Sequence, residues 1–187
     1  MRILLVADDL DDAIAVETSL TAEGHVVASC NDEFGGPCRG LDHLQDCPLE
    51  SPVDLAVIAR SGNIHRGIGE MGSVCAARHR VGVVEIDPTQ PGEESIAELA
   101  DLAERAVCHD YERTVLGELR HVGVDDVYVT VHRRPGTVMV TITVPAERFA
   151  TMSDREVASL ADRVRDATRR HDRFARSIDV SVVRSER

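Results

Sequence analysis

The sequence contains no lysine and no tryptophan, and aromatic residues make up 3% of its 187 positions. All 21 basic residues are therefore arginines. The missing lysine excludes Schiff-base chemistry, a Walker-type phosphate lysine and any switch that acts through a lysine side chain. The scarcity of aromatic rings argues against the base stacking by which proteins hold single-stranded nucleic acids.

Long apolar runs are absent as well. The longest continuous runs of uncharged apolar residues, residues 3–7 and 55–59, are much shorter than a membrane-spanning helix requires. The stretch after Met1 leads directly into four aspartates, which does not fit a secretory signal; they are Asp8, Asp9, Asp11 and Asp12. Because hydrophobic residues still make up 43% of the chain, the sequence predicts a folded cytoplasmic protein with no membrane partner.

The formal net charge of −12 is unevenly distributed. Residues 1–110 contain 21 acidic residues against 7 arginines, a net of −14, whereas residues 111–187 contain 12 against 14, a net of +2. This asymmetry indicates two modules with different surfaces. The acidic first module repels phosphate, and the late arginines alternate with aspartates, so the composition argues against nucleic acid as a partner.

The first half alternates short apolar runs with helical or loop segments. Residues 2–7, 25–29, 54–59 and 81–86 are expected to be buried parallel strands. Helices are expected over residues 11–23 and 68–80, with a weaker one over 39–46. This order predicts an α/β domain with a parallel sheet over residues 1–92. Helical periodicity then continues through residues 93–121 as one linking helix or two, with no clear fifth strand unless residues 106–108 supply it.

The second half changes to a periodicity of two. Valines alternate with polar residues over 127–131 and again over 138–144, around a Pro135-Gly136 turn. Ser153 and Glu156 form a capping box that opens a helix, and a last alternating strand covers residues 178–182. Together with the preceding helix, residues 122–187 predict a smaller α+β domain of α-β-β-α-β order. Because a hairpin edge of such a small sheet is open to pairing, we expect a homodimer through residues 111–187.

Several motifs of the first half resemble the receiver domain of bacterial response regulators, which has a flavodoxin-like fold. They are the run RILLVADD at the first strand, EGHVV at the second, PVDLAVIA at the third, and Gly67. In the second half, VYVTVHRRPGTVMVTITV and SIDVSVV resemble in pattern the ferredoxin-like dimerisation domain of cation-efflux proteins.

The receiver resemblance implies a set of functional positions, several of which are changed. Asp8 and Asp9 match the acid pair that holds Mg²⁺ in active receivers, but the phosphoacceptor position falls on Ala59. The lysine of the family cannot be present, although His109 lies near its place, and Thr89 is a late match for the expected hydroxyl residue. Because phosphoryl transfer needs the nucleophile, the metal and the lysine, the resemblance implies a degenerate pseudo-receiver that works as a binding or dimerisation module.

Two groups of residues are candidate sites. The aspartates Asp8, Asp9 and Asp12 could bind a divalent cation such as Mg²⁺ at the edge of the sheet, or they could cap the following helix. Three thiols and an imidazole within 18 residues have the donors for Zn²⁺ or for a redox pair, namely Cys30, Cys38, His43 and Cys47. Their spacing is not that of a zinc knuckle, and buried free thiols are the alternative. Cys75 and Cys108 are expected in helix cores.

The favoured function is that of a non-catalytic regulatory or interaction protein that requires no cofactor and has a second copy or another protein as partner. One alternative is a metal- or redox-responsive sensor that uses the cysteine and histidine group. Another is an enzyme of unknown reaction at the carboxyl edge of the sheet, beside Asp8, Asn31 and Asn63. GxSxG, GxGxxG, P-loop and HExxH motifs are all absent, so the sequence favours the non-catalytic reading.

Overall fold

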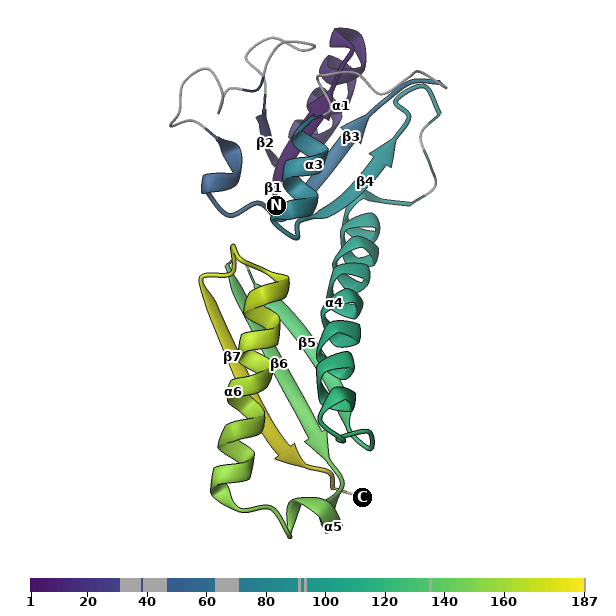
Figure 1. Cartoon of the computed structure of the whole chain (residues 1–187). Helices are drawn as coiled ribbons and strands as arrows, with labels where there is room; N and C mark the ends of the chain where they lie inside the picture. The colour runs from purple at the N-terminus through teal and green to yellow at the C-terminus, as the bar shows by residue number, and fades with distance from the viewer. Residues whose placement is uncertain are drawn as a thin grey trace. The chain divides into compact units, whose positions relative to one another are not determined.

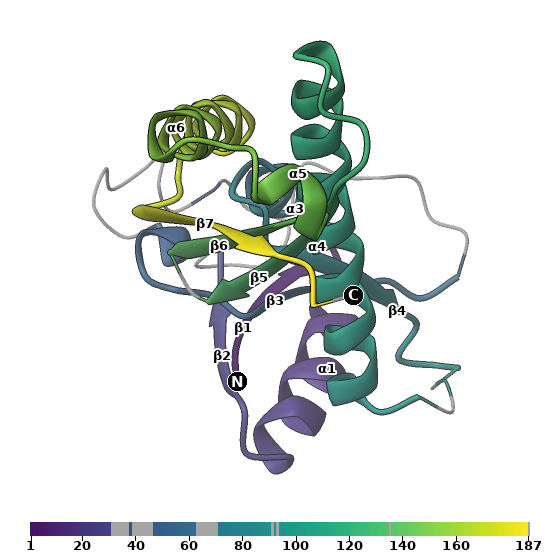
Figure 2. The same cartoon turned by 90° about the horizontal axis from the view of Figure 1, so that it is seen from below.

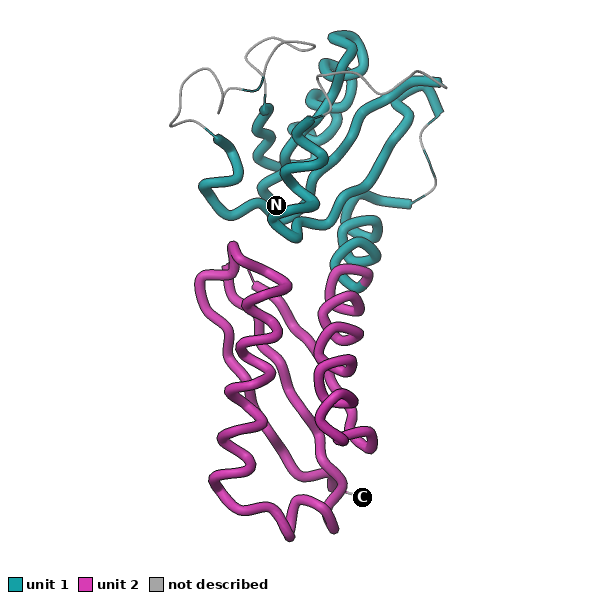
Figure 3. Tube along the Cα trace, viewed as in Figure 1, with its two compact units in different colours: residues 1–105 teal, residues 106–187 magenta. Residues whose placement is uncertain are grey.

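The computed structural model describes residues 1–30, 38, 47–62, 71–90, 92, 94–134 and 136–186. The chain divides into two compact units, residues 1–105 and 106–187, which Figure 3 shows in different colours. Their boundary falls inside helix α4 (Ile96–His121), so the first turns of that helix belong to unit 1 and the remainder to unit 2. Each unit has its own apolar core, and each is described separately below.

Unit 1 is built on a four-stranded sheet of order β2-β1-β3-β4 (Figure 1). Its strands are β1 (Arg2–Ala7), β2 (Val26–Ser29), β3 (Leu55–Ala59) and β4 (Gly82–Ile86), and all neighbouring pairs are parallel. The continuous apolar runs of β1 and β3 are buried along almost their whole length, as a parallel sheet that is covered on both faces requires. The predicted flavodoxin-like α/β fold class is thereby confirmed.

Helices cover both faces of this sheet. Alternate side chains of β1 and β3 point to opposite faces, so each strand contributes to two apolar clusters. One cluster packs against α1 (Leu10–Ala22) and the first turns of α4, and the other packs against α3 (Met71–Arg78) and the short 3₁₀ helix η1 (Pro48–Glu50). The weak helix expected over residues 39–46 lies outside the described residues.

The described residues contain no fifth strand in unit 1, because residues 106–108 are helical and belong to α4. The 3.6-residue periodicity that runs through this segment outweighs a three-residue apolar run. Strand β4 therefore lies at the edge of the described sheet, and α4 approaches it closely. At Gly82, an added Cβ would lie 2.8 Å from the Cβ of Ala103, so glycine is what allows this approach.

Unit 2 contains a three-stranded sheet of order β5-β6-β7. The hairpin strands β5 (Tyr128–Arg134) and β6 (Thr137–Val144) are antiparallel, and β7 (Ser177–Arg184) is parallel to β6. The parallel pair requires a crossover, which α5 (Ala146–Phe149) and α6 (Asp154–His171) provide. The capping box predicted at the start of α6 is present: the side chain of Ser153 accepts from the Glu156 amide, and the Glu156 carboxylate accepts from the Ser153 amide at 2.8 Å.

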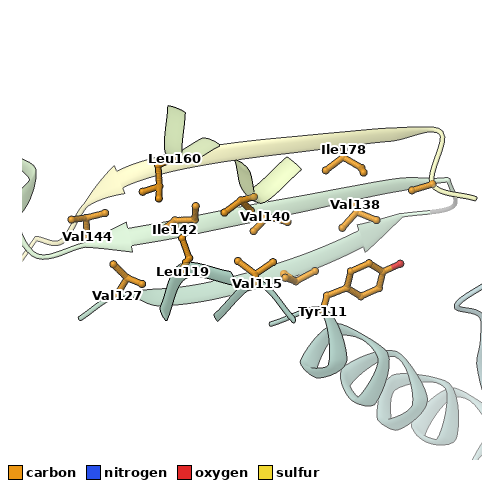
Figure 4. Packing of buried hydrophobic residues seen from close by; sticks show 13 residues of the cluster. Tyr111, Val115, Leu119, Val127, Val138, Val140, Ile142, Val144, Leu160 and Ile178 are labelled. Carbon is orange, nitrogen blue, oxygen red and sulfur yellow. The ribbon is translucent and has the colours of Figure 1, made fainter. Parts of the chain in front are cut away.

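The core of unit 2 lies between one face of its sheet and the two helices α4 and α6 (Figure 2). Figure 4 shows the side chains that α4 contributes, Tyr111, Val115 and Leu119, beside alternate valines and Ile142 of β6. The remaining side chains of these strands, which alternate with those in the core, point to the opposite face of the sheet. One of its cross-strand rows consists of Tyr128, Thr143 and Val183, and there Tyr128 is 77% exposed.

In the described part of the chain, no helix combines the length and the hydropathy that crossing a membrane requires. The longest, α4, carries acidic and basic residues along its whole length.

Candidate functional site

Three strands of unit 1 end side by side at one edge of the sheet. The register places Ala7 of β1 beside Ala59 of β3, and Ala59 beside Ile86 of β4. The residues that follow these strand ends therefore meet at the carboxyl edge, where open α/β sheets bind their ligands. This edge brings together the aspartates after β1, the loop after β3, and Asp87.

The aspartates after β1 have different roles. Asp9 is the N-cap of α1, and its carboxylate accepts from the amides of Asp11 at 2.9 Å and Asp12 at 3.1 Å. Asp12 is buried to 6% exposure, and its Oδ2 atom accepts from the amide of Ser61 at 2.7 Å. Asp8 is exposed at the same edge. Asp9 therefore caps α1, as predicted by the alternative to cation binding, and Asp12 binds Ser61, the second residue after β3.

Asp87 completes this arrangement, and sequence reasoning missed it. Its Oδ1 atom accepts from the hydroxyl of Thr89 at 2.6 Å and from the Thr89 amide at 2.8 Å, and its Oδ2 atom accepts from the Gly62 amide at 3.3 Å. These hydrogen bonds, those from Thr89 above all, hold the pKa of the Asp87 carboxyl below its usual range. An acid directly after the fourth predicted strand, two residues before a threonine, was the signal that could have identified this turn.

Ala59 brings no polar group to the edge. It is 2% exposed and packs in the same apolar cluster as Ala7 and Ala13. The next residue, Arg60, places its Nη1 atom 2.9 Å from a carboxylate oxygen of Glu85 in β4. At this edge Asp9, Asp12 and Asp87 therefore accept hydrogen bonds from backbone amides, Glu85 faces Arg60, and the end of β3 offers no nucleophile.

A cavity of about 390 Å³ lies beside this edge, between α1, the end of β4 and the first turns of α4. Its apolar wall includes Leu20, Ile86 and Leu99, and acidic side chains stand at its rim, including Glu85 and Asp87. Asp8 does not line it, and Asn31 and Asn63 lie outside the described residues. The described cavity is therefore not the pocket that the enzyme alternative required beside those three residues.

Three cysteines share one apolar cluster on the α3 side of the sheet. Cys30 follows β2, is 3% exposed, and shares an apolar cluster with Cys47 and Cys75. Burial, together with the nearby thiols of Cys38, Cys47 and Cys75, raises the pKa of Cys30 to about 12. Three of the predicted site residues are thus neighbours, and Cys75, which the sequence had assigned to a helix core, joins them.

The remaining member of the predicted metal or redox set, His43, lies outside the described residues. Cys108, which was predicted in a helix core, packs against the core of unit 2 from α4. All five cysteines are free thiols. In the residues that the structure describes, no three side chains of the histidine, cysteine or acidic type are already placed to hold a metal ion.

A buried polar cluster in unit 2 was also missed. The hydroxyl of Tyr111 donates to Oδ2 of Asp172 at 2.7 Å, and Oδ1 of Asp172 accepts from the amides of Phe174 and Ala175. Asp172 is 5% exposed. The cluster connects α4 with the turn from α6 into β7, which indicates a structural role.

A scan of the chain against models of protein families gives no match, and a search among curated proteins gives none either. The chemistry of the site is therefore inferred from its residues. They form a sheet edge whose acids hold loops in place, and a group of neighbouring thiols on one face of the same sheet.

Proposed function

We propose that the protein is a non-catalytic regulatory or interaction protein, in which a phosphorylation-incompetent, receiver-like unit 1 is joined to a unit 2 that forms a homodimer. The observation that carries the proposal is Ala59, whose methyl group is buried at the end of β3, where the resemblance expects the phosphoacceptor aspartate. The complete absence of lysine supports it further. The proposed protein requires no cofactor, and its short apolar runs support a cytoplasmic location.

The hydrogen bonds at the sheet edge support the same proposal. In a phosphoryl-transfer site, carboxylates must be available to a metal ion that neutralises the phosphate oxygens. In unit 1, Asp9 instead caps α1, and Asp12 and Asp87 accept from the amides of Ser61 and Gly62, so they hold the first residues after β3 from two sides. An edge held in this way suits a module that presents a constant surface to a partner.

The proposed dimer interface is the sheet face of unit 2 that carries Tyr128, Thr143 and Val183. Tyr128 and Val183 are 77% and 39% exposed, and both flank Thr143 in one cross-strand row. The β5 edge that the sequence suggested is less available, because Glu112 of α4 accepts from the amide of Val131 at 3.2 Å. A second copy is therefore expected to pack against the exposed face of this sheet rather than to pair with its β5 edge.

The phosphorylation part of the proposal is tested with a small acyl-phosphate donor and Mg²⁺. We expect no phosphate on the chain by intact-protein mass spectrometry, while an active response regulator treated in parallel gains one phosphoryl group. Phosphorylation of Asp8 or Asp9, accompanied by a change of oligomeric state, would refute the proposal.

The dimer is tested by light scattering coupled to size-exclusion chromatography. We expect the wild-type protein to be dimeric and Tyr128→Arg to be monomeric, because the substitution places a charge within the proposed interface. Ile14→Arg is the matched control, since Ile14 is 51% exposed on α1 in unit 1. A wild-type monomer across the concentration range, or a dimer that survives Tyr128→Arg, would contradict the proposed interface.

A further inference from the structure

The cavity of about 390 Å³ in unit 1 is an elongated groove that follows α1. Five positions on one stripe of this helix and its C-cap line the groove, namely Ala15, Val16, Ser19, Leu20 and Glu23. At the rise of an α-helix, the distance along the axis from the first to the last is about 12 Å. The groove is therefore long enough to hold an extended aliphatic chain.

The wall of this groove is apolar and free of aromatic rings. Val16 and Leu20 are each 3% exposed, and they line the groove together with Ile96 and Leu99 of α4. All four belong to, or pack against, the apolar cluster between the sheet and α1. No aromatic side chain is among the described residues of the lining. Such a wall suits methylene groups, and the volume lies within the range of small-molecule sites.

All charged residues of the described lining are acidic: Glu23, Glu85, Asp87 and Glu94. Glu85 is already paired, because its carboxylate lies 2.9 Å from Nη1 of Arg60. Hydrogen bonds, from Thr89 above all, lower the pKa of Asp87 and keep its carboxylate ionised. Glu23 lies 3.6 Å from the imidazole of His25, which carries a charge only when it is protonated. The groove therefore attracts cations and repels anions.

Two of these acids lie at opposite ends of the groove. Glu23 is the C-cap of α1 and so marks one end of the helix. At the other end, Asp12 in the first turn of α1 accepts from the amide of Ser61, and the next amide, that of Gly62, donates to Asp87. Asp87 is thereby held near the start of the helix. A ligand that uses both acids must carry a cation at each end.

We propose that this groove binds a linear aliphatic diamine or polyamine, whose methylene chain lies along the apolar wall and whose ammonium groups lie near Glu23 and Asp87. Ammonium N–H groups donate to carboxylates, whereas a quaternary ammonium ion is best held by aromatic faces, which the described lining lacks. The oxygens of Asp87 already accept from Thr89 and Gly62, so at that end the attraction is mainly one of charge.

The proposal is tested on the full-length protein by isothermal titration calorimetry with octamethylenediamine. Octylamine has the same methylene chain with one ammonium group, and ethylenediamine has two ammonium groups that are too close together to reach both ends. We expect one octamethylenediamine to bind per chain. Because the second ion pair forms at an exposed site, we expect this diamine to bind about fivefold more tightly than either control compound.

A pair of matched variants separates the groove from the general charge of unit 1. Glu23→Gln should weaken the binding of octamethylenediamine about fivefold and remove its advantage over octylamine. Glu17→Gln makes the same change of charge on the same helix, at an exposed residue outside the lining, and should keep the affinity within about twofold. Both glutamates are exposed, so both variants should keep the wild-type circular dichroism spectrum.

Three results would overturn the proposal. The first is that octamethylenediamine shows no saturable binding, and the second is that octylamine or ethylenediamine binds as tightly. The third is an equal loss of affinity in Glu17→Gln and Glu23→Gln, which would show that the diamine responds only to the net charge of unit 1. None of these outcomes bears on the proposed function, which depends on Ala59 and Tyr128.

Discussion

Removing the hydroxyl group of Tyr111 tests whether its buried hydrogen bond stabilises unit 2. The ring is completely buried in α4, and its hydroxyl donates to Oδ2 of Asp172 at 2.7 Å. The other carboxylate oxygen accepts from the amides of Phe174 and Ala175, so Asp172 bonds both α4 and the turn before β7. Tyr111→Phe removes one of these three donors and leaves the carboxylate buried.

The expected loss follows from this geometry. Phenylalanine keeps the ring and its edge-on contact with His171, whose ring centre is 4.9 Å away, so no cavity forms. What is lost is a hydrogen bond to a charged acceptor, and we expect the free energy of unfolding to fall by about 2 kcal/mol. For a unit of this size, that loss corresponds to a decrease of about 8–16 °C in its melting temperature.

The measurement must report on unit 2 alone. Hydrogen exchange resolved by peptide gives the opening free energy of the slowest amides in α6 and β7. Ser159→Ala is the matched control, because it removes a hydroxyl from an exposed side chain of α6 in the same unit, and it should change stability by less than about 0.5 kcal/mol. If Tyr111→Phe is as stable as this control, the buried hydrogen bond does not hold α4 to the rest of the unit.

Two further predictions concern close packing and helix capping. Gly82→Ala places a Cβ 2.8 Å from that of Ala103 and should cost about 1–3 kcal/mol in urea unfolding, whereas Gly117→Ala, in the same helix α4 as Ala103, meets nothing and should stabilise by about 0.5–1 kcal/mol. Equal stability of the two variants would contradict the close approach of α4 to β4. Ser153→Ala should lower the melting temperature at neutral pH. The Ser153 amide and, after it, the Ser153 hydroxyl lower the pKa of Glu156 in the folded state, and the variant loses only the hydroxyl. The stability that comes from the hydroxyl–carboxylate bond is complete above the unfolded pKa and lost as pH falls through the folded pKa. The difference between wild type and variant should therefore shrink in acid to the part that comes from the Glu156 amide bond to the hydroxyl, and a constant difference would rule out this coupling.

The fold class could be predicted because its signals are local. The apolar runs of β1 and β3 indicated strands buried on both faces, and the alternating valines of β5 and β6 indicated a hairpin with one buried face. The capping box at Ser153 also depends only on residues within one helical turn. Each of these features depends on residues that are close together in the sequence, so each can be predicted from the sequence alone.

The functional groups were harder to predict because their partners are distant in the chain. Tyr111 and Asp172 are 61 residues apart, and nothing near either residue indicates the other. Cys75 joins the other thiols because α3 covers the same sheet face as η1, which depends on the path of two crossovers. Asp87 lies on the strand end that meets Gly62, so its role required the sheet register. In each case tertiary arrangement, which the sequence pattern does not specify, decides the contact.

The loop after β3 shows why the activity of this protein is better sought at its surfaces than at its sheet edge. A phosphorylation switch needs a loop that can move when a phosphoryl group arrives, and carboxylates that can exchange their partners for a metal ion. Here the amides of Ser61 and Gly62 already satisfy Asp12 and Asp87. Removing the Ser61 amide would leave the buried Asp12 carboxylate short of a donor, at a cost of about 1–3 kcal/mol, and Ala59 could form no bond with a phosphoryl group in return. A ligand at this edge therefore gains little by displacing Ser61, whereas the side chain of Tyr128 is already exposed.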